Sequence, residues 1–97
     1  MTATVTPPEE RISRRTRSGS GDAWRVIVKN DDHNTFEGVA FALSHTIPGV
    51  DYDKGMRLAN KIHTKGQAIV WSGHRELAEL YHSQLDGYGL TMAPLER

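Results

Sequence analysis

The sequence of 97 residues contains no cysteine, and its twelve basic residues are balanced by twelve acidic ones. Without cysteine there is no disulfide framework, no thiolate ligand for zinc and no cysteine nucleophile. A net charge of zero disfavours a general nucleic-acid binder, which must neutralise several phosphates. No apolar run approaches the length of a membrane span, and the N-terminus lacks the apolar core of a secretory signal. We therefore expect a cytoplasmic protein that binds neither nucleic acid nor membrane.

Composition divides the chain into two parts. Residues 1–22 hold threonine, proline, serine, glycine and four arginines with almost no apolar side chains, so burial cannot offset the entropy of ordering them. We expect a flexible N-terminal extension there and one small core domain over residues 23–97. The basic run Arg14-Arg15-Thr16-Arg17 is short, and a solvated terminus explains it better than nucleic-acid binding does.

Six segments of the core domain have the periodicity of regular structure. Apolar residues that recur at steps of two indicate strands, and steps of three and four indicate helices. We expect strands at about residues 24–29, 67–71 and 90–95, and helices at about residues 35–46, 52–64 and 74–86. This order, β-α-α-β-α-β, predicts an α+β fold in which three helices pack against a small three-stranded sheet.

The same periodicity predicts which side chains face the core. In the first strand Trp24, Val26 and Val28 share one face, and Arg25, Ile27 and Lys29 share the other. Each helix has one apolar stripe. The predicted stripes are Phe36, Val39, Ala40, Leu43 and Ile47; Tyr52, Met56, Ala59, Ile62 and His63; and Leu77, Leu80, Tyr81 and Leu85.

Local signals predict where the elements begin and end. Asn34 followed by Glu37 resembles a capping box at the start of the first helix. Asp51 can cap the second helix, and Gly66 can end it in the left-handed conformation. Pro94 cannot donate to a strand ladder, so the last strand should lie at a sheet edge or end there.

The stretch Asn30-Asp31-Asp32 is the first candidate for a functional site, because a hydrophobic strand ends there in an acidic turn that opens a helix. Two adjacent carboxylates also have ordinary explanations, as solvated turn residues or as anions near the positive end of a helix dipole. The turn alone leaves these alternatives open.

A second candidate stretch carries a histidine at the end of the second helix. Ile62-His63 is followed by Gly66 and then by Ala68-Ile69 at the start of a strand. On its own, this histidine has an ordinary role beside the negative end of the helix dipole. Together, however, the acidic turn and the pattern apolar-His-x-x-Gly-x-Ala-Ile resemble the ClpS family of protease adaptors over about residues 24–97.

The resemblance implies a fold and a function. The ClpS fold is shared with the C-terminal domain of the ribosomal stalk protein. ClpS proteins are non-enzymatic adaptors without cofactor or metal, which bind proteins with bulky hydrophobic N-terminal residues (N-degrons, under the N-end rule). They deliver these proteins to the N-terminal domain of a ClpC/ClpA-type AAA+ chaperone for degradation by the Clp protease. Residues 68–71 and 89–96 look most like the cyanobacterial version, which implies a ClpC-type partner.

The resemblance also assigns site residues. The positions that hold the α-amino group of the bound peptide match Asn30, Asp32 and His63, with Asp31 as the adjacent acid. The positions of the hydrophobic pocket match Asn34, Phe36, Val39, Ala59 and Ile62. A methionine commonly stands at the position of Ala59 in this family, so alanine implies a roomier or differently shaped pocket.

Two other classes of function were possible from the residues alone. An enzyme is disfavoured because no serine or threonine lies in a nucleophile turn and the histidines are scattered without convincing metal-ligand spacing. These histidines are His33, His45, His63, His74 and His82. The alternative function is a stalk-type interaction module that binds its partner through a helix face. Such a module would tolerate the loss of Asp31 and Asp32, whereas a receptor for N-terminal residues would not.

Overall fold

The computed structural model describes residues 23–97, so the expected N-terminal extension, residues 1–22, lies outside the described part. The elements are β1 (Trp24–Lys29), α1 (Phe36–Thr46), α2 (Tyr52–Lys65), β2 (Gln67–Gly73), α3 (Arg75–Gly87) and β3 (Thr91–Met92). The predicted order β-α-α-β-α-β is confirmed. Within the described part, no helix is both long and apolar enough to span a membrane.

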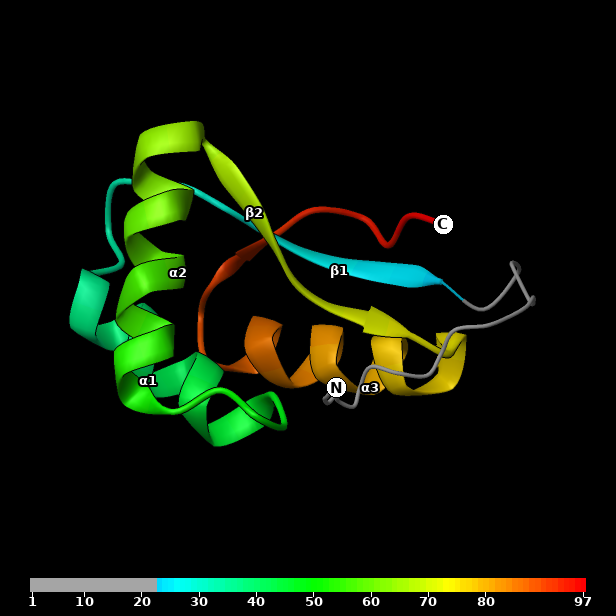
Figure 1. Ribbon diagram of the computed structural model, residues 1–97. Coiled ribbons are helices and arrows are strands. Elements are labelled where there is room, and N and C mark those ends of the chain that lie inside the picture. The colour runs from blue at the N-terminus through cyan, green and yellow to red at the C-terminus, as the bar shows by residue number, and fades with distance from the viewer. Residues whose placement is uncertain (1–22) are drawn as a thin grey trace, which may run out of the picture.

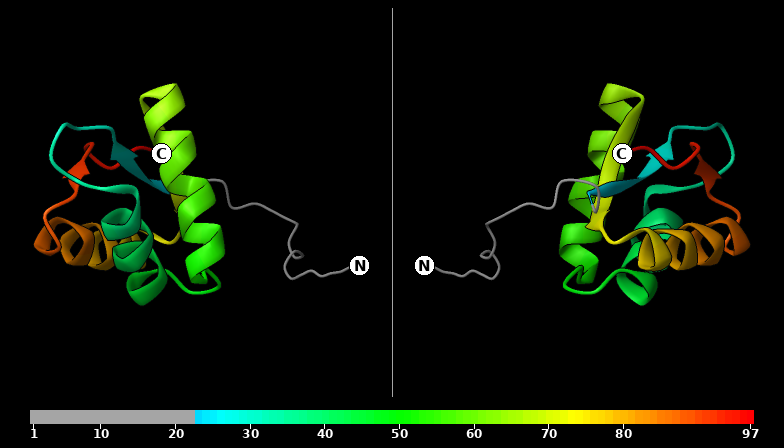
Figure 2. Two further views of the ribbon diagram at one scale, coloured as in Figure 1. Left: turned by 90° about the vertical axis from the view of Figure 1, so that its left-hand side faces the viewer. Right: turned by 90° about the vertical axis from the view of Figure 1, so that its right-hand side faces the viewer.

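The strands form one antiparallel sheet in the order β2-β1-β3. β1 therefore lies in the middle, and its last residue, Lys29, pairs with Gln67 of β2 and Thr91 of β3. β3 is an edge strand that ends before Pro94, as predicted. In Figure 1 α2 stands nearly upright at one end of the sheet, while α3 runs along and below the strands. Figure 2 shows the same two helix directions from either side.

One core joins the sheet to all three helices. Val26 and Val28 of β1 are buried in it, as their alternation predicts. The helices contribute Val39, Ala42 and Leu43 from α1, Ala59 and Ile62 from α2, and Ala78 and Leu85 from α3. Ile27 was predicted on the face opposite Val26 and Val28, and it is also buried, with 2% of its surface exposed. Its strand has a neighbour on both sides, with Ile69 opposite it on β2 and a hydrogen bond from Ala93 to its carbonyl.

The predicted stripes of α2 and α3 need correction. Leu77 and Leu80 are 41% and 47% exposed, and Tyr52 at the start of α2 is also exposed. The buried face of α3 instead runs through Ala78 and Leu85. Tyr81 lies between them on this face and packs edge-to-face on Trp71, with ring centroids 5.0 Å apart. The small alanine marks the core face because it lets α3 approach the sheet, whereas the larger leucines point outwards.

The predicted helix ends are correct for α2 and wrong for the start of α1. The Asp51 side chain accepts a hydrogen bond from the Lys54 amide, and Gly66 has a left-handed φ of 91°. The cap of α1, however, is Thr35, whose hydroxyl oxygen accepts from the Gly38 amide at 2.9 Å. Asn34 is therefore not the capping residue, and its side chain is free to bond elsewhere.

The two consecutive helices α1 and α2 are in close contact at Gly55. A Cβ atom at this position would lie 2.8 Å from the carbonyl oxygen and 2.9 Å from the Cα of Ala40. Only glycine permits this approach without a backbone shift. The contact sets the distance between the start of α1 and the second half of α2, which is where the candidate site lies.

We expect Gly55→Ala to lower the free energy of unfolding by about 1–3 kcal/mol, since an added methyl group here overpacks backbone atoms. The matched control is Gly87→Ala at the end of α3, where nothing lies within 4 Å of an added Cβ. Alanine is the better helix former, so the control should leave stability unchanged or slightly raised. Urea denaturation of both variants measures this difference, and equal stabilities would refute the proposed close contact.

Candidate functional site

A cavity of about 320 Å³ opens where the turn after β1 passes the second half of α2. In Figure 1 this turn runs beside the upper part of α2 before it enters α1. The cavity is lined by Val28, Lys29, Asn30, Asp31, Asp32, Asn34, Phe36, Val39, Ala59 and His63. The volume falls at the lower end of the range of small-ligand pockets, roughly 300–1,000 Å³, which suits a ligand of about one amino-acid residue.

Eight of the nine site residues predicted from the sequence line this cavity. The exception is Ile62, which is 3% exposed and belongs to the hydrophobic core. Val28 and Lys29 line the cavity but were not predicted as site residues. Both residues could have been predicted from their position at the end of β1, directly before the acidic turn.

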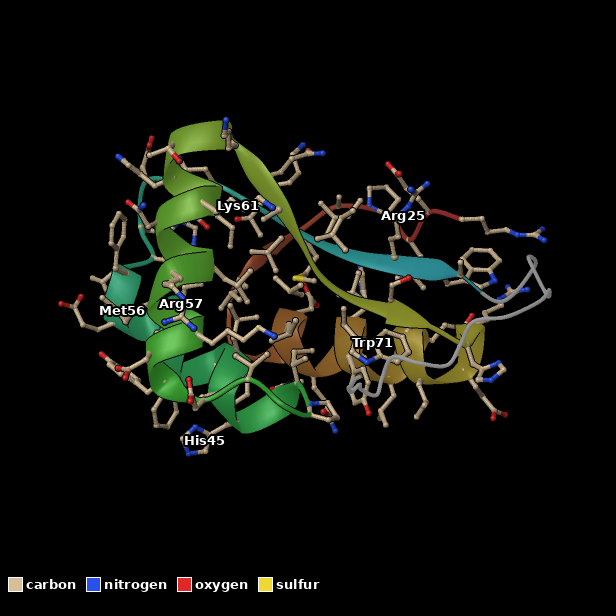
Figure 3. The ribbon with its side chains drawn as sticks, viewed as in Figure 1. Arg25, His45, Met56, Arg57, Lys61 and Trp71 are labelled. Atoms are coloured by element: carbon tan, nitrogen blue, oxygen red, sulfur yellow. The ribbon has the colours of Figure 1, made fainter. Side chains whose placement is uncertain are left out.

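One side of helix α2 faces the cavity, and another side carries Lys61 (Figure 3). Met56, Ala59 and His63 recur at steps of three and four, so they follow one another along one side of the helix. In Figure 3 Met56 lies at the edge of α2 next to the start of α1, whereas Lys61 points towards β2. The cavity therefore lies on the Met56 side, and the positive charge of Lys61 is directed away from it.

The apolar wall of the cavity comes from β1 and both helices. Val28, Val39 and Ala59 are buried, and Phe36 is half-buried against the same core. The small side chain of Ala59 leaves space between the two helices. A large apolar group placed in this space would lose its contact with water, worth roughly 1.5–3 kcal/mol if fully buried.

His63 lies in the last turn of α2, on the rim of the cavity. Its ring is exposed and packs edge-to-face on Phe36, with centroids 5.2 Å apart and an interplanar angle of 62°. Contact between the two rings limits the orientations available to the imidazole. The first residue of α1 thus supports the histidine supplied by the end of α2.

The Asp31 carboxylate is the centre of a hydrogen-bond network in the turn. Its Oδ1 accepts from the backbone amides of His33 and Asn34, at 3.0 and 2.8 Å. Its Oδ2 accepts from the Asn34 side-chain amide at 2.8 Å and from the Thr91 hydroxyl at 2.7 Å. The side chain is only 13% exposed, so these bonds replace most of its contact with water.

These hydrogen bonds decide the charge of Asp31. Burial disfavours the ionised form and by itself would raise the pKa of the carboxyl group. The donors from Thr91, Asn34 and His33 outweigh that effect and hold the pKa of Asp31 well below its usual range. The turn therefore carries a fixed negative charge at any pH near neutrality.

Asn30 and Asp32 differ from Asp31 in being exposed. The backbone amide of Asn30 donates to the Gly66 carbonyl at 2.9 Å and ties the turn to the end of α2. Within residues 23–97, no hydrogen bond or ion pair engages the side chains of Asn30 and Asp32. Their oxygen atoms therefore remain available to accept hydrogen bonds from a ligand.

A second cavity, of about 340 Å³, lies between the ends of α1 and α3 and is lined by His45, Thr46, Gln84, Gly87 and Tyr88. Figure 3 shows His45 at the opposite end of the helix pair from the turn. No carboxylate lines this second cavity. Among residues 23–97, no cluster of three or more His, Asp or Glu residues is placed to hold a metal ion.

The fold and the first cavity define a small α+β domain with an apolar pocket beneath an acidic rim, and comparisons with known proteins identify its family. Residues 20–93 match the profile of the family described as ATP-dependent Clp protease adaptor protein ClpS. The Clp protease adapter protein ClpS of a Nostoc species is 53% identical over 93 residues, which cover 96% of this chain and 93% of that protein. The Synechocystis counterpart is 48% identical over 95 residues, 98% of this chain and 94% of that protein.

A solved structure agrees with these relatives. The structure of Agrobacterium tumefaciens ClpS2 bound to L-phenylalaninamide is similar to this one with a TM-score of 0.71 and 25% sequence identity, covering 77% of this chain and 95% of that chain. The chain belongs to the ClpS family of Clp protease adaptors. The resemblance to the cyanobacterial version of ClpS is likewise confirmed.

We expect Asp31→Asn to lower the free energy of unfolding at pH 7 by about 1–3 kcal/mol, because asparagine cannot accept all four hydrogen bonds of the carboxylate. The folded chain holds the pKa of this group below the ordinary value of 3.8, so its stabilisation is fully present above that pH. The stabilisation is lost as the pH falls through the lowered folded-state value. The difference between variant and native chain should therefore shrink below about pH 4.

Thermal unfolding at pH 7, 5 and 3 measures this effect. Glu76→Gln is the control, since Glu76 is an exposed acid in the first turn of α3 and makes none of these bonds. A loss of stability in Asp31→Asn that stays constant from pH 7 to 3 would contradict the assigned charge of Asp31.

Proposed function

We propose that the cavity beside the acidic turn binds the first residue of proteins that carry a bulky hydrophobic N-terminus. The α-ammonium group lies at the rim and the side chain enters the apolar space. The adaptor then delivers the bound protein to a ClpC/ClpA-type AAA+ chaperone in the cytoplasm, for degradation by the Clp protease. In this role the chain binds and transfers proteins without catalysing a reaction.

The chemistry of the rim carries this proposal. An α-ammonium group offers three N–H donors and one positive charge. The Asp32 carboxylate, the Asn30 amide oxygen and an imidazole nitrogen of His63 are acceptors on the rim, and Asp31 adds a second negative charge. Hydrogen bonds to charged groups contribute about 1.5–3 kcal/mol each, so the rim favours a free N-terminus over an internal peptide.

The apolar part of the cavity supplies the second requirement. Its walls, Val28, Phe36, Val39 and Ala59, offer no charged group to a side chain that enters between them. Neither a free amine nor an apolar side chain alone should bind well after the cost of association. A bulky hydrophobic residue at a free N-terminus satisfies both parts of the site together.

The ligand of the Agrobacterium relative has the same two features. L-Phenylalaninamide combines a free α-ammonium group with an aromatic side chain, and its amide stands in for the next peptide bond. The shared fold and family support a similar ligand for the present chain. The relatives' description as Clp protease adapters supports delivery to the chaperone.

A stalk-type interaction module is the alternative function. The exposed Leu77 and Leu80, one turn apart on α3, favour it because they offer an apolar helix face to a partner. This face does not contribute to the cavity, so the two functions depend on different residues. Substitutions in the acidic turn separate them.

The direct test is the affinity of fluorescent peptides that begin with free Phe, Leu, Val or Met, measured by anisotropy at neutral pH. We expect the free Phe peptide to bind and its N-acetylated copy to lose binding, because acetylation removes the ammonium charge and two of its three donors. The relative affinities of the Leu, Val and Met peptides report the shape of the space beside Ala59. Equal binding of the free and acetylated Phe peptides would refute the proposal.

Asp32→Asn should weaken binding of the free Phe peptide by about 10–150-fold, which corresponds to the loss of one charge-assisted hydrogen bond. Glu37→Gln is the matched control, because Glu37 is an exposed acid in the first turn of α1 that does not line the cavity. The control should bind within about twofold of the native chain. If both substitutions weaken binding equally, the effect is one of general charge and the role assigned to Asp32 is wrong.

A further inference from the structure

The Asp31 carboxylate has little capacity left for a ligand. A carboxylate has about four lone-pair sites, and the bonds from His33, Asn34 and Thr91 supply four donors. An incoming ammonium group would have to displace one of these donors before it could bond to Asp31. Asp32 is exposed in the same turn, so its carboxylate oxygens can accept from a ligand without the loss of an existing hydrogen bond.

Two of the hydrogen bonds in this network connect the turn to a distant part of the chain. The Thr91 hydroxyl donates to Asp31 across 60 positions of sequence. The Asn34 side-chain amide donates both to Asp31 and, at 2.9 Å, to the Gly89 carbonyl. The acidic turn is therefore held at two points, by the first residue of β3 and by the connection that precedes this strand.

We propose that Thr91 and Asn34 are positioning residues of the N-terminus receptor, which act through Asp31 to hold Asp32 and Asn30 in the geometry that accepts an ammonium group. This inference rests on the proposed function and adds the start of β3, together with the connection before it, to the binding machinery. Asp31 contributes its fixed charge and the shape of the turn, and its neighbours make the contacts with the ligand.

The sheet places Thr91 where this role requires it. Thr91 pairs with Lys29, the last residue of β1, so its side chain lies beside the point where the turn begins. On the other side, the Asn30 amide is bonded to Gly66 at the end of α2. The turn is thus held from both flanks, by β3 and by α2, before any ligand binds.

Holding the turn in advance should raise affinity. A binding loop that is mobile in the free protein must be ordered on association, and that cost lowers the observed affinity. Removal of the Thr91 hydroxyl leaves the cavity walls and both exposed acceptors in place. It should therefore weaken binding without altering the groups that contact the ligand.

The test compares Thr91→Val, which removes the hydroxyl at nearly constant shape, with Thr91→Ser, which keeps it. We expect the valine variant to bind the free Phe peptide about 3–30-fold more weakly, and the serine variant to bind within about threefold of the native chain. The matched control is Thr64→Val, which removes a hydroxyl bonded within α2 to the Asn60 carbonyl. This control should leave the affinity within about twofold.

Hydrogen exchange of the free protein provides a second measurement that needs no ligand. The His33 and Asn34 amides donate to Asp31, so they should exchange faster in Thr91→Val, while amides in the middle of α3 stay unchanged. If Thr91→Val does not fold, Asn34→Ala removes the second tie and is measured in the same way. Affinities are compared below the melting temperature of every variant.

The outcomes separate this inference from the proposed function. If the native chain binds free Phe and Thr91→Val binds equally well with unchanged exchange, the positioning role is refuted and the receptor stands. If the native chain binds no free N-terminus, the receptor itself fails, and the positioning role fails with it. A serine variant that binds as weakly as the valine variant would also overturn the inference, because the effect would not come from the hydroxyl.

Discussion

The close contact between α1 and α2 is the constraint on which the site depends. Gly55 lets α2 rest against the backbone of Ala40, where any larger residue would push the helices apart. Phe36 and Val39 from α1 then face Ala59 and His63 from α2 across a space of one residue's size. A wider separation of the helices would open the cavity to water. A rotation of α2 would turn Ala59 away from the cavity and bring a charged residue such as Lys61 towards it. The pocket is therefore a consequence of how two helices pack.

The acidic turn divides two tasks between neighbouring carboxylates. Asp31 is mostly covered and accepts four hydrogen bonds, so it shapes the turn and keeps its charge. Asp32 is exposed and without a partner among the described residues, so it is available to a ligand. A single exposed aspartate would lack the hydrogen bonds that order the turn. A single aspartate with all of its hydrogen bonds made would have no free oxygen to accept from a ligand. Two adjacent aspartates thus provide both an ordered turn and a free acceptor.

Much of the fold could be predicted because its signals are local. Strand alternation, the Asp51 cap and the Gly66 stop each follow from a few adjacent residues. The predicted face of α3 was correct at Leu85 and wrong at Leu77 and Leu80, because helix periodicity favoured the leucines whereas Ala78 is the residue that packs against the sheet. The cap of α1 was wrong because Asn34 and Thr35 are both good capping residues. The structure shows that the Asn34 side chain bonds instead to Asp31 and to the carbonyl of Gly89, which is 55 residues away.

The candidate site was predictable in its residues and unpredictable in their arrangement. The motif marked Asn30, Asp31, Asp32 and His63, all of which line the cavity. The resemblance separated Asp32, which matches a position that holds the α-amino group, from Asp31, the adjacent acid, but it offered no physical reason for this difference. Part of the reason is the hydrogen bond from Thr91 to Asp31, and Thr91 reaches the turn only through strand pairing. Ile62 was assigned to the pocket because it matches a pocket-lining position of the ClpS family, but it is 3% exposed and does not line this cavity. Adjacent helix residues point about 100° apart, so Ile62 and His63 face different ways. Long-range contacts thus decide what each motif residue does.

The most direct measurement of the central claim is a map of amide chemical-shift changes when L-phenylalaninamide is added to the protein. If the cavity receives an N-terminal residue, the shifts should concentrate at Asn30, Asp32, Phe36, Ala59 and His63, and leave the outer face of α3 unchanged. N-acetyl-L-phenylalaninamide at the same concentration should produce no comparable shifts. Changes centred on Leu77 and Leu80, or equal changes with both compounds, would contradict an N-terminus receptor at this site.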